Sequence, residues 1–293
     1  ASRLRDAVAR EGSFVLPGFY GATVDGAIKL FQRGGGDITG AIVARCLDAG
    51  LYENWTDVSG FLSADPHIVE HPRAIGRITF DEMRELSYMG ASVLQEEAIF
   101  PVREANIPIQ IKNTNSPSDV GTVIRETADG DVSEHLITGI AGRKDFTAIH
   151  IKKAHMSNEV GVISRALHIV ERYGVSVEHI PTGVDSFGIV VNAADVRDTI
   201  YSIIADIRHE IEPDDITMVD RLALVSVVGR NMSKRSGTSG KIFGALGEAN
   251  INIRMITQSS EEISIIVGVD NADFDRTISV IYERFVRDEM VLR

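Results

Sequence analysis

Hydrophobic and polar residues follow two different patterns along the chain. Up to about residue 125, apolar runs rich in β-formers at 13–20, 51–61 and 107–114 alternate with segments of helical periodicity. This alternation is typical of an α/β fold with a mostly parallel sheet. The clearest helix has Asp37 as its expected N-cap and carries one apolar face, formed by Ile38, Ile42, Val43, Cys46 and Leu47.

The second half of the chain contains an internal repeat. Residues 161–180 parallel residues 240–256: in both, an amphipathic helix runs through a Gly or Asn stop into an alternating strand. With the strand at 146–153, the first copy has the order βαββαβ. The second copy lacks a final strand, which would leave an open sheet edge. We predict that the run at 135–142 fills this edge, so that the first module is inserted within the second.

Composition narrows the class of protein. The 293 residues contain 44% hydrophobic residues, enough for two or three domains. The net charge of -12 argues against a nucleic-acid binder. The single cysteine permits no internal disulfide, and no apolar run is long enough to span a membrane, so a cytoplasmic protein without a membrane partner is expected. Because the chain begins with alanine close to a strand-like run, we expect a fragment.

The glycine-rich run Arg33–Asp37 has two interpretations. Glycines before a helix let backbone N–H groups approach an anion, but the same residues also suit a tight turn between a strand and a helix. Thr56 and Asp57 follow a strand-like run, and the carboxyl ends of strands are where open α/β sheets bind ligands. The neighbouring Trp55 is expected in the core rather than against a nucleotide base.

Six motifs make the chain resemble aspartate kinases, members of the amino acid kinase family. They are "VLPGFYG", "RGGGDITGA", "ENWTDVSGFLSADP", "EMRELSYMGASVL", "IPIQIKNT" and "GTVI", in the family's order and spacing. The second half resembles the paired ACT domains of these enzymes. The resemblance implies an α/β kinase portion over 1–128, followed by two α+β ferredoxin-like modules: ACT1 over 144–220, and ACT2 over 221–293 with the strand 135–143.

The implied activity is transfer of the ATP γ-phosphoryl group to the side-chain carboxylate of L-aspartate, which gives 4-aspartyl phosphate and opens lysine, threonine and methionine synthesis. By position, Asp37 matches the aspartate that organises the groups around the phosphoryl, and Arg33 matches the arginine that grips the substrate carboxylate. The residues matching the nucleotide and substrate contacts are Gly34, Gly35, Thr56, Asp57 and Ser92. Mg²⁺ is expected with ATP, without a dedicated metal site or a tightly bound cofactor.

The chain also departs from the family pattern. Gly36 stands where the family commonly has Ser, His67 where it has Arg, and Ser92 where it has a nucleotide-contacting Lys. No KFGGTS stretch, which carries another phosphate-contacting lysine in the family, occurs in the sequence. Losing such cations weakens transition-state stabilisation. We therefore expect the chain alone to be inactive as a kinase.

The ACT resemblance implies homo-oligomers and a bound feedback amino acid, lysine or threonine. The candidate effector residues are Met156, Ser176, Val177, Glu178 and Asp185 in the first module, and Asn250 and Asn252 in the second. The alternative for Ser176, Asn250 and Asn252 is that they cap helices and turns.

Two other functions stay open. The chain could be a non-catalytic regulatory subunit that binds an amino acid and partners a full-length kinase, although residues 13–125 keep motifs that a sensor does not need. It could also resemble a kinase of glutamate or its acetyl derivative, which the paired ACT modules and "TDVSGF" disfavour. The sequence does not identify the effector, or distinguish a dimer from a tetramer.

Overall fold

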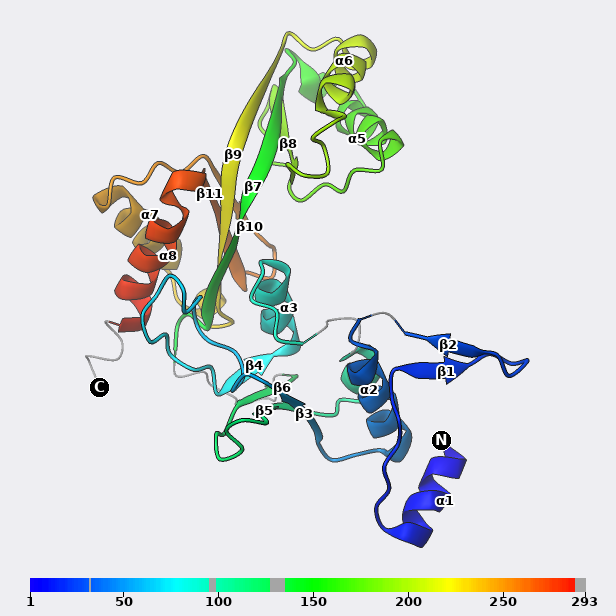
Figure 1. Ribbon diagram of the computed structural model, residues 1–293. Coiled ribbons are helices and arrows are strands. Elements are labelled where there is room, and N and C mark those ends of the chain that lie inside the picture. The colour runs from blue at the N-terminus through cyan, green and yellow to red at the C-terminus, as the bar shows by residue number, and fades with distance from the viewer. Residues whose placement is uncertain (32, 95–98, 127–134, 288–293) are drawn as a thin grey trace.

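The computed structural model describes residues 1–31, 33–94, 99–126 and 135–287. We call residues 1–126 the N-terminal region and residues 135–287 the C-terminal region. Each region has its own sheet, and helix α3 lies where the two meet (Figure 1). The predicted order of an α/β portion followed by ferredoxin-like modules is confirmed.

The N-terminal region is built on a mixed four-stranded sheet of order β3-β5-β6-β4, in which β3 pairs with β5 and β4 with β6 in parallel, and β5 pairs with β6 antiparallel. A separate hairpin, β1–β2, precedes it. The elements are α1 (Ser2–Glu11), β1 (Tyr20–Ala22), β2 (Ile28–Leu30), α2 (Gly35–Leu47), β3 (Tyr52–Thr56), β4 (Arg77–Thr79), α3 (Phe80–Tyr88), α4 (Phe100–Glu104), β5 (Ile109–Asn113) and β6 (Thr122–Arg125).

Two local predictions for this region were wrong. The apolar run at 13–20 is not a strand, since β1 begins only at Tyr20. Pro17 has no N–H to donate to a ladder, and Val15 is fully exposed, so the run pairs with a neighbouring strand only from Phe19, whose carbonyl accepts from the Phe31 N–H. Helix α2 begins at Gly35 with Gly34 as its N-cap, so Asp37 lies in the first turn rather than at the cap.

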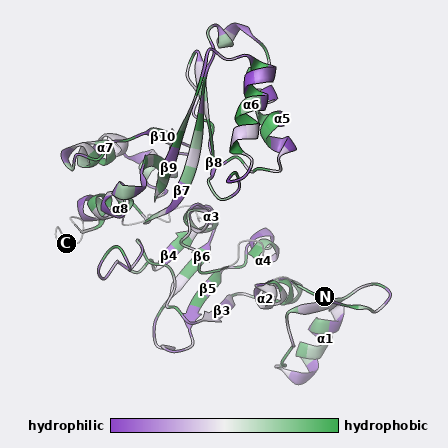
Figure 2. Cartoon of the chain, turned by 45° about the horizontal axis from the view of Figure 1, so that its top comes forward, coloured by the Kyte–Doolittle hydropathy of each residue, from purple (hydrophilic) through white to green (hydrophobic). Residues whose placement is uncertain are grey.

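The C-terminal region is a continuous antiparallel sheet of order β10-β11-β9-β7-β8. Helices α5 and α6 cover one end of it, and α7 and α8 the other (Figure 1). Figure 2 shows hydrophobic residues running along its strands. The elements are β7 (Gly139–Lys152), α5 (Val162–Arg172), β8 (Ser186–Asn192), α6 (Ile200–Ile211), β9 (Asp215–Val228), α7 (Thr238–Glu248), β10 (Met255–Gln258), β11 (Ser264–Asp270), α8 (Phe274–Tyr282) and a π-helical turn, Glu283–Arg287.

The long strands β7 and β9 join the two modules. Gly139–Arg143 pairs with Leu224–Val228 beside β11, whereas Phe146–Lys152 pairs with the first half of β9 beside β8. A bulge after Arg143 separates the two halves. The strand predicted at 135–142 therefore pairs with the strand of the second copy, while the domain bounds stay predictions. The sequence also predicts a polar linker over residues 125–135, and most of it, 127–134, lies outside the described residues.

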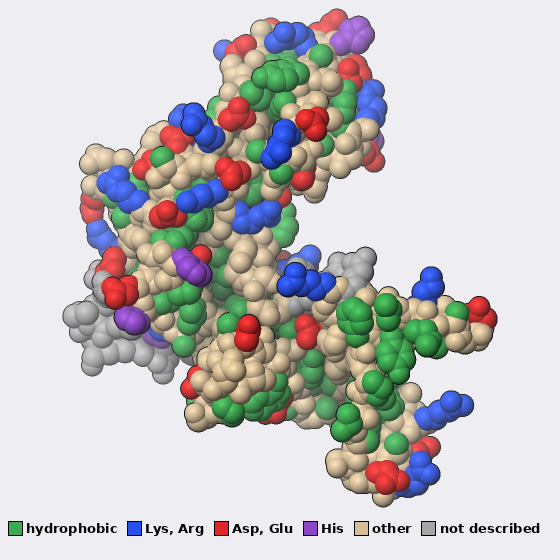
Figure 3. All heavy atoms as spheres, viewed as in Figure 1, with side chains coloured by type: hydrophobic (Ala, Val, Ile, Leu, Met, Phe, Trp, Pro, Cys, Tyr) green, Lys and Arg blue, Asp and Glu red, His purple; other side chains and the backbone are tan. Residues whose placement is uncertain are grey.

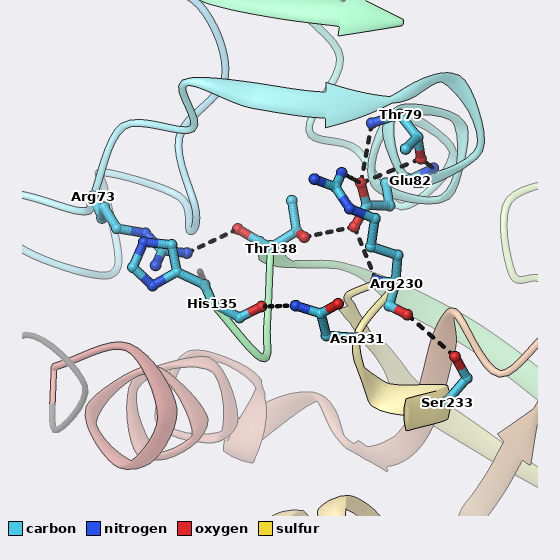
Figure 4. A network of polar contacts seen from close by, with 8 residues as sticks. All are labelled: Arg73, Thr79, Glu82, His135, Thr138, Arg230, Asn231 and Ser233. Atoms are coloured by element: carbon cyan, nitrogen blue, oxygen red, sulfur yellow. Dashed lines mark hydrogen bonds and ion pairs between the residues drawn. The ribbon is translucent and has the colours of Figure 1, made fainter. Parts of the chain in front are cut away.

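Helix α3 links the two regions through a buried carboxylate. Thr79 caps the helix, and Glu82 three residues later completes a capping box with it. The fully buried Glu82 carboxylate also accepts hydrogen bonds from Thr138 Oγ1 at 2.6 Å, and from the N–H and Nη1 of Arg230 at 2.9 Å and 2.8 Å (Figure 4). Because Thr138 and Arg230 flank β7 and β9, this network ties α3 to the C-terminal sheet.

Candidate functional site

The glycine-rich turn before α2 is packed on one side and open on the other. Gly34 has a φ of 90°, a left-handed conformation that favours glycine. A side chain at Gly35 would collide with Phe31, because its Cβ would lie 2.5 Å from Phe31 Cβ. Around Gly36, by contrast, there is open space. Gly34 and Gly35 thus have structural reasons to be glycine, and Gly36 leaves the start of α2 accessible.

Asp37 is held against strand β3. Its Oδ1 accepts a hydrogen bond from Asn54 Nδ2 at 2.8 Å, and the same amide lies 3.2 Å from Tyr52 Oη. The Tyr52 hydroxyl in turn donates to the Asp37 carbonyl at 3.3 Å. Burial raises the pKa of the Tyr52 phenol, the hydrogen bond with Asn54 lowers it, and the Asp37 carboxylate adds to the increase. Within the described residues, no hydrogen bond is made to the second carboxylate oxygen of the half-buried Asp37.

Thr56 and Asp57 lie at the carboxyl end of β3, as the sequence predicts. Thr56 Oγ1 donates to Asp57 Oδ1 at 3.2 Å, and the Thr56 carbonyl accepts from the N–H of Thr114, which follows β5. The prediction that Trp55 is in the core was wrong: it is 45% exposed, with Lys112 Nζ 5.6 Å from its ring centroid. On β3 it points to the face opposite Asn54, whose side chain is buried.

Two of the predicted kinase residues lie apart from this network. The Arg33 side chain is exposed, and within the described residues it forms no ion pair. Ser92 lies in the loop after α3, where its hydroxyl is 3.5 Å from the Leu94 carbonyl. In the described part of the chain, no hydrogen bond joins Ser92 to Asp37 or Thr56.

Three of the candidate effector residues line one groove. Ser176, Val177 and Glu178 border an open groove of about 1050 Å³ beside α5, together with residues of that helix. The segment they begin forms only isolated bridges to β8, at His179 and Thr182, instead of the regular strand predicted from the repeat. Pro181 interrupts the ladder because it lacks an N–H.

The other candidate effector residues do not line this groove. Met156 is buried in the core of the first module, and the Asp185 side chain is exposed. Asn252 is exposed. Asn250 has a φ of 53°, and its N–H donates to the Gly247 carbonyl at the end of α7. This geometry favours the alternative that Asn250 ends a helix.

Sequence reasoning missed Asn54 and Tyr52. Both lie within β3, and the sequence motif there points only to Thr56 and Asp57 at the end of the strand. Asn54 is buried although its side chain is polar. A buried polar residue on a strand needs a partner, and this was the available signal. Among the described residues, no helix is long and apolar enough to cross a membrane. Nor do they contain a group of three or more acidic, His or Cys side chains suited to a metal ion.

Comparisons with known proteins agree with this organisation. The amino acid kinase family matches residues 1–113, and the ACT domain family matches residues 225–285. Aspartokinase 3 of Bacillus subtilis (strain 168) is 41% identical over 284 residues, which cover 97% of this chain and 62% of that protein. The chain therefore spans less than two thirds of the length of that relative.

Solved structures give the same result. Clostridium acetobutylicum aspartate kinase is 51% identical with a TM-score of 0.89, over 92% of this chain and 62% of the other. E. coli aspartokinase III in complex with lysine and aspartate is 26% identical with a TM-score of 0.74, over 92% of this chain and 59% of the other. Its complex with aspartate and ADP gives 25% identity and a TM-score of 0.72, over 91% and 59%.

The two family matches fall on the two structural regions in the expected order, and the identities to aspartate kinases extend over nearly all of the chain. The chain therefore contains an amino acid kinase region followed by an ACT domain region, and it is similar to aspartate kinases over nearly all of its length.

Proposed function

We propose that the chain acts as part of an aspartate kinase, which transfers the γ-phosphoryl group of ATP to the side-chain carboxylate of L-aspartate. The observation that carries this proposal is the hydrogen bond from Asn54 to Asp37. It fixes the start of α2 against β3, whose carboxyl end carries Thr56 and Asp57. A phosphate at this edge would meet both the helix start and the predicted nucleotide contacts.

The chemistry of these groups suits phosphoryl transfer. The dipole at the start of α2 favours an anion, and Gly36 leaves that end accessible. The Arg33 guanidinium can bind a substrate carboxylate with two parallel hydrogen bonds. Asp37 would organise the reacting groups with its second oxygen. Mg²⁺ enters with ATP as the substrate complex, where it neutralises phosphate charge.

Regulation by lysine or threonine forms the second part of the proposal. The groove at Ser176–Glu178 offers a carboxylate and hydroxyls to a free amino acid, and the irregular edge beside it is available to a second copy in a homo-oligomer. The lysine complex of E. coli aspartokinase III supports an amino acid effector in this family. Inhibition requires that the effector bind two states of the protein with different affinities.

Calorimetric titration of the 293-residue chain tests both parts. MgATP, L-aspartate, lysine and threonine are titrated separately into the unaltered chain and into Arg33→Ala. We expect Arg33→Ala to weaken aspartate binding by at least about tenfold, because a charge-assisted pair is lost, and to leave MgATP binding unchanged. The control is Arg45→Ala on α2, the helix that follows Arg33; the Arg45 side chain pairs with Glu104.

The outcomes separate the candidate functions. Lysine or threonine binding without MgATP or aspartate binding would establish the regulatory subunit in place of the kinase. Binding of both substrates without turnover agrees with the expectation that this chain is inactive alone. Aspartate-dependent ADP release by the purified chain would contradict that expectation, but it would support the kinase assignment.

A further inference from the structure

Glu178 borders the groove and also contacts helix α3 of the N-terminal region. Its side chain is 10% exposed and borders the groove with Ser176 and Val177. Its Oε2 accepts a 2.5 Å hydrogen bond from Tyr88 Oη, and its Oε1 lies 3.8 Å from Arg143 Nη1. Tyr88 is the last residue of α3, so a carboxylate of the first module holds the end of a helix of the N-terminal region.

The segment after Tyr88 leads directly to a predicted nucleotide residue. Gly90 packs on the Arg143 side chain, since a Cβ on Gly90 would lie 3.5 Å from Arg143 Cγ. Ser92 follows two residues later. Both partners of Glu178, Tyr88 and Arg143, therefore contact or form part of the segment 88–92.

A free amino acid in the groove would need an acceptor for its ammonium group. The groove is bordered by two carboxylates, Glu171 and Glu178, and Glu171 already lies 2.9 Å from His168 Nδ1. An ammonium ion binds a carboxylate more strongly than a neutral phenol does. Burial first, and then the bond to Glu178, raise the pKa of Tyr88 to about 12, so the phenol remains a neutral donor near neutral pH.

We propose that Glu178 is a shared acceptor, held by Tyr88 in the effector-free protein and taken by the ammonium group of a bound amino acid, so that effector binding releases the end of α3 and the loop Gly90–Ser92. This inference rests on the proposed function, because it assumes that an amino acid binds at Glu178 and a nucleotide near Ser92. Tyr88 is then a positioning residue for that loop, and binding of the effector amino acid and binding of the nucleotide weaken each other through the loop.

The test compares Tyr88→Phe with the unaltered chain. Lysine and threonine are titrated with and without saturating MgATP, and backbone hydrogen exchange is followed over residues 88–93. In the unaltered chain we expect MgATP to weaken effector binding by about tenfold, and the effector to speed exchange in this segment. The Tyr88→Phe variant should bind the effector more tightly, and the ratio of its effector Kd with and without MgATP should fall to about one. Backbone hydrogens of residues 88–93 should exchange rapidly in this variant before any effector is added.

A matched control is Tyr201→Phe, which removes a hydroxyl from an exposed tyrosine on α6, in the module that carries Glu178. It should behave like the unaltered chain. The inference is overturned if Tyr88→Phe binds the effector with unchanged affinity and shows the same effector-dependent exchange. That result would leave the proposed function standing, which MgATP and aspartate binding test separately. If MgATP does not bind, hydrogen exchange still decides the inference, and if neither effector binds, the inference fails with the regulatory proposal.

Discussion

The C-terminal region buries its hydrophobic residues far more completely than the N-terminal region does. Strands β8 and β11 contain unbroken runs of buried residues, whereas α1 and the β1–β2 hairpin bury none. Most of the exposed large hydrophobic side chains in the described residues precede residue 126. Figure 3 shows such side chains gathered where the hairpin meets α2. Stability should therefore depend on different residues in the two regions, even where the residue type is the same.

The boundary between the regions is neither purely apolar nor exposed. Met83 and Leu86 of α3 pack in a core shared with Leu224 and Ile266 of the C-terminal sheet. Beside them, the Glu82 carboxylate collects its hydrogen bonds from both regions. The two regions are therefore joined by a helix that belongs to the first and is half enclosed by the second.

The largest effect is expected from Glu82→Ala. This change leaves the Arg230 guanidinium largely buried without its carboxylate, and leaves Thr138 without an acceptor. Removing one partner of a buried ion pair costs about 3–5 kcal/mol of the free energy of unfolding. Urea unfolding followed by circular dichroism measures the loss, and it should separate the transitions of the two regions.

The control for Glu82→Ala is Glu85→Ala, which lies about one turn further along α3 and whose side chain is only partly buried. It should change the free energy of unfolding by less than about 0.5 kcal/mol. Equal losses for the two variants would show that the network does not couple the regions.

A matched pair of isoleucine substitutions tests the contrast in burial. Ile203 on α6 is 0% exposed, whereas Ile28 on β2 is 72% exposed. We expect Ile203→Ala to cost about 2–5 kcal/mol, from lost transfer energy and the cavity left behind. Ile28→Ala should cost less than about 0.5 kcal/mol. Thermal and urea unfolding of both variants measure the difference, and a large loss at Ile28 would mean that the hairpin face is covered in solution.

The same contrast explains how far the sequence could be interpreted. In the C-terminal region Ile203, Ile207 and Ile211 recur at helical spacing and are buried, because the amphipathic helix α6 covers the sheet beside it. In the N-terminal region the apolar run at 13–20 satisfied the same rule of composition but is not a strand. A hydrophobic pattern predicts an element reliably only when the fold supplies a surface to bury it.

Long-range polar contacts lay beyond sequence reasoning for a different reason. The sequence placed Thr56 and Asp57 correctly at a strand end, because strand ends follow from local pattern. The partner of Asp37 is Asn54, 17 residues away, and that of Glu82 is Arg230, 148 residues away. Such pairs depend on how helices and strands pack against one another, which the local sequence does not specify. For this reason the sequence predicted an N-cap role for Asp37, whereas the residue lies in the first turn of α2 and bonds to β3.

Thr79→Ala should have a smaller effect that separates local from interregional stabilisation. Thr79 is the N-cap of α3, and its hydroxyl accepts a hydrogen bond from the Glu82 N–H at 3.1 Å, which alanine cannot replace. The loss of a cap costs about 1 kcal/mol, and the lost hydroxyl contact to Glu82 adds to this. Thr79→Ser keeps the capping oxygen and should recover most of the stability. If both variants lose as much as Glu82→Ala does, the capping box rather than the link to Arg230 holds the regions together.

The smallest effect concerns His179, one of several side chains of the C-terminal region that have a buried polar atom without a hydrogen-bond partner among the described residues. Its Nε2 is buried, and no partner for it exists among the described residues. Burial lowers the pKa of His179 below 6.5, and the nearby Glu178 carboxylate only partly opposes this. The unfolded chain therefore binds the proton more readily, so the free energy of unfolding should fall as the pH drops below about 6.5 and be constant above it.

His179→Gln should flatten the pH dependence of the free energy of unfolding, measured with urea between about pH 5 and pH 7, whereas Ser176→Ala in the same segment should keep it. An equally steep fall in His179→Gln would assign the pH dependence to other groups.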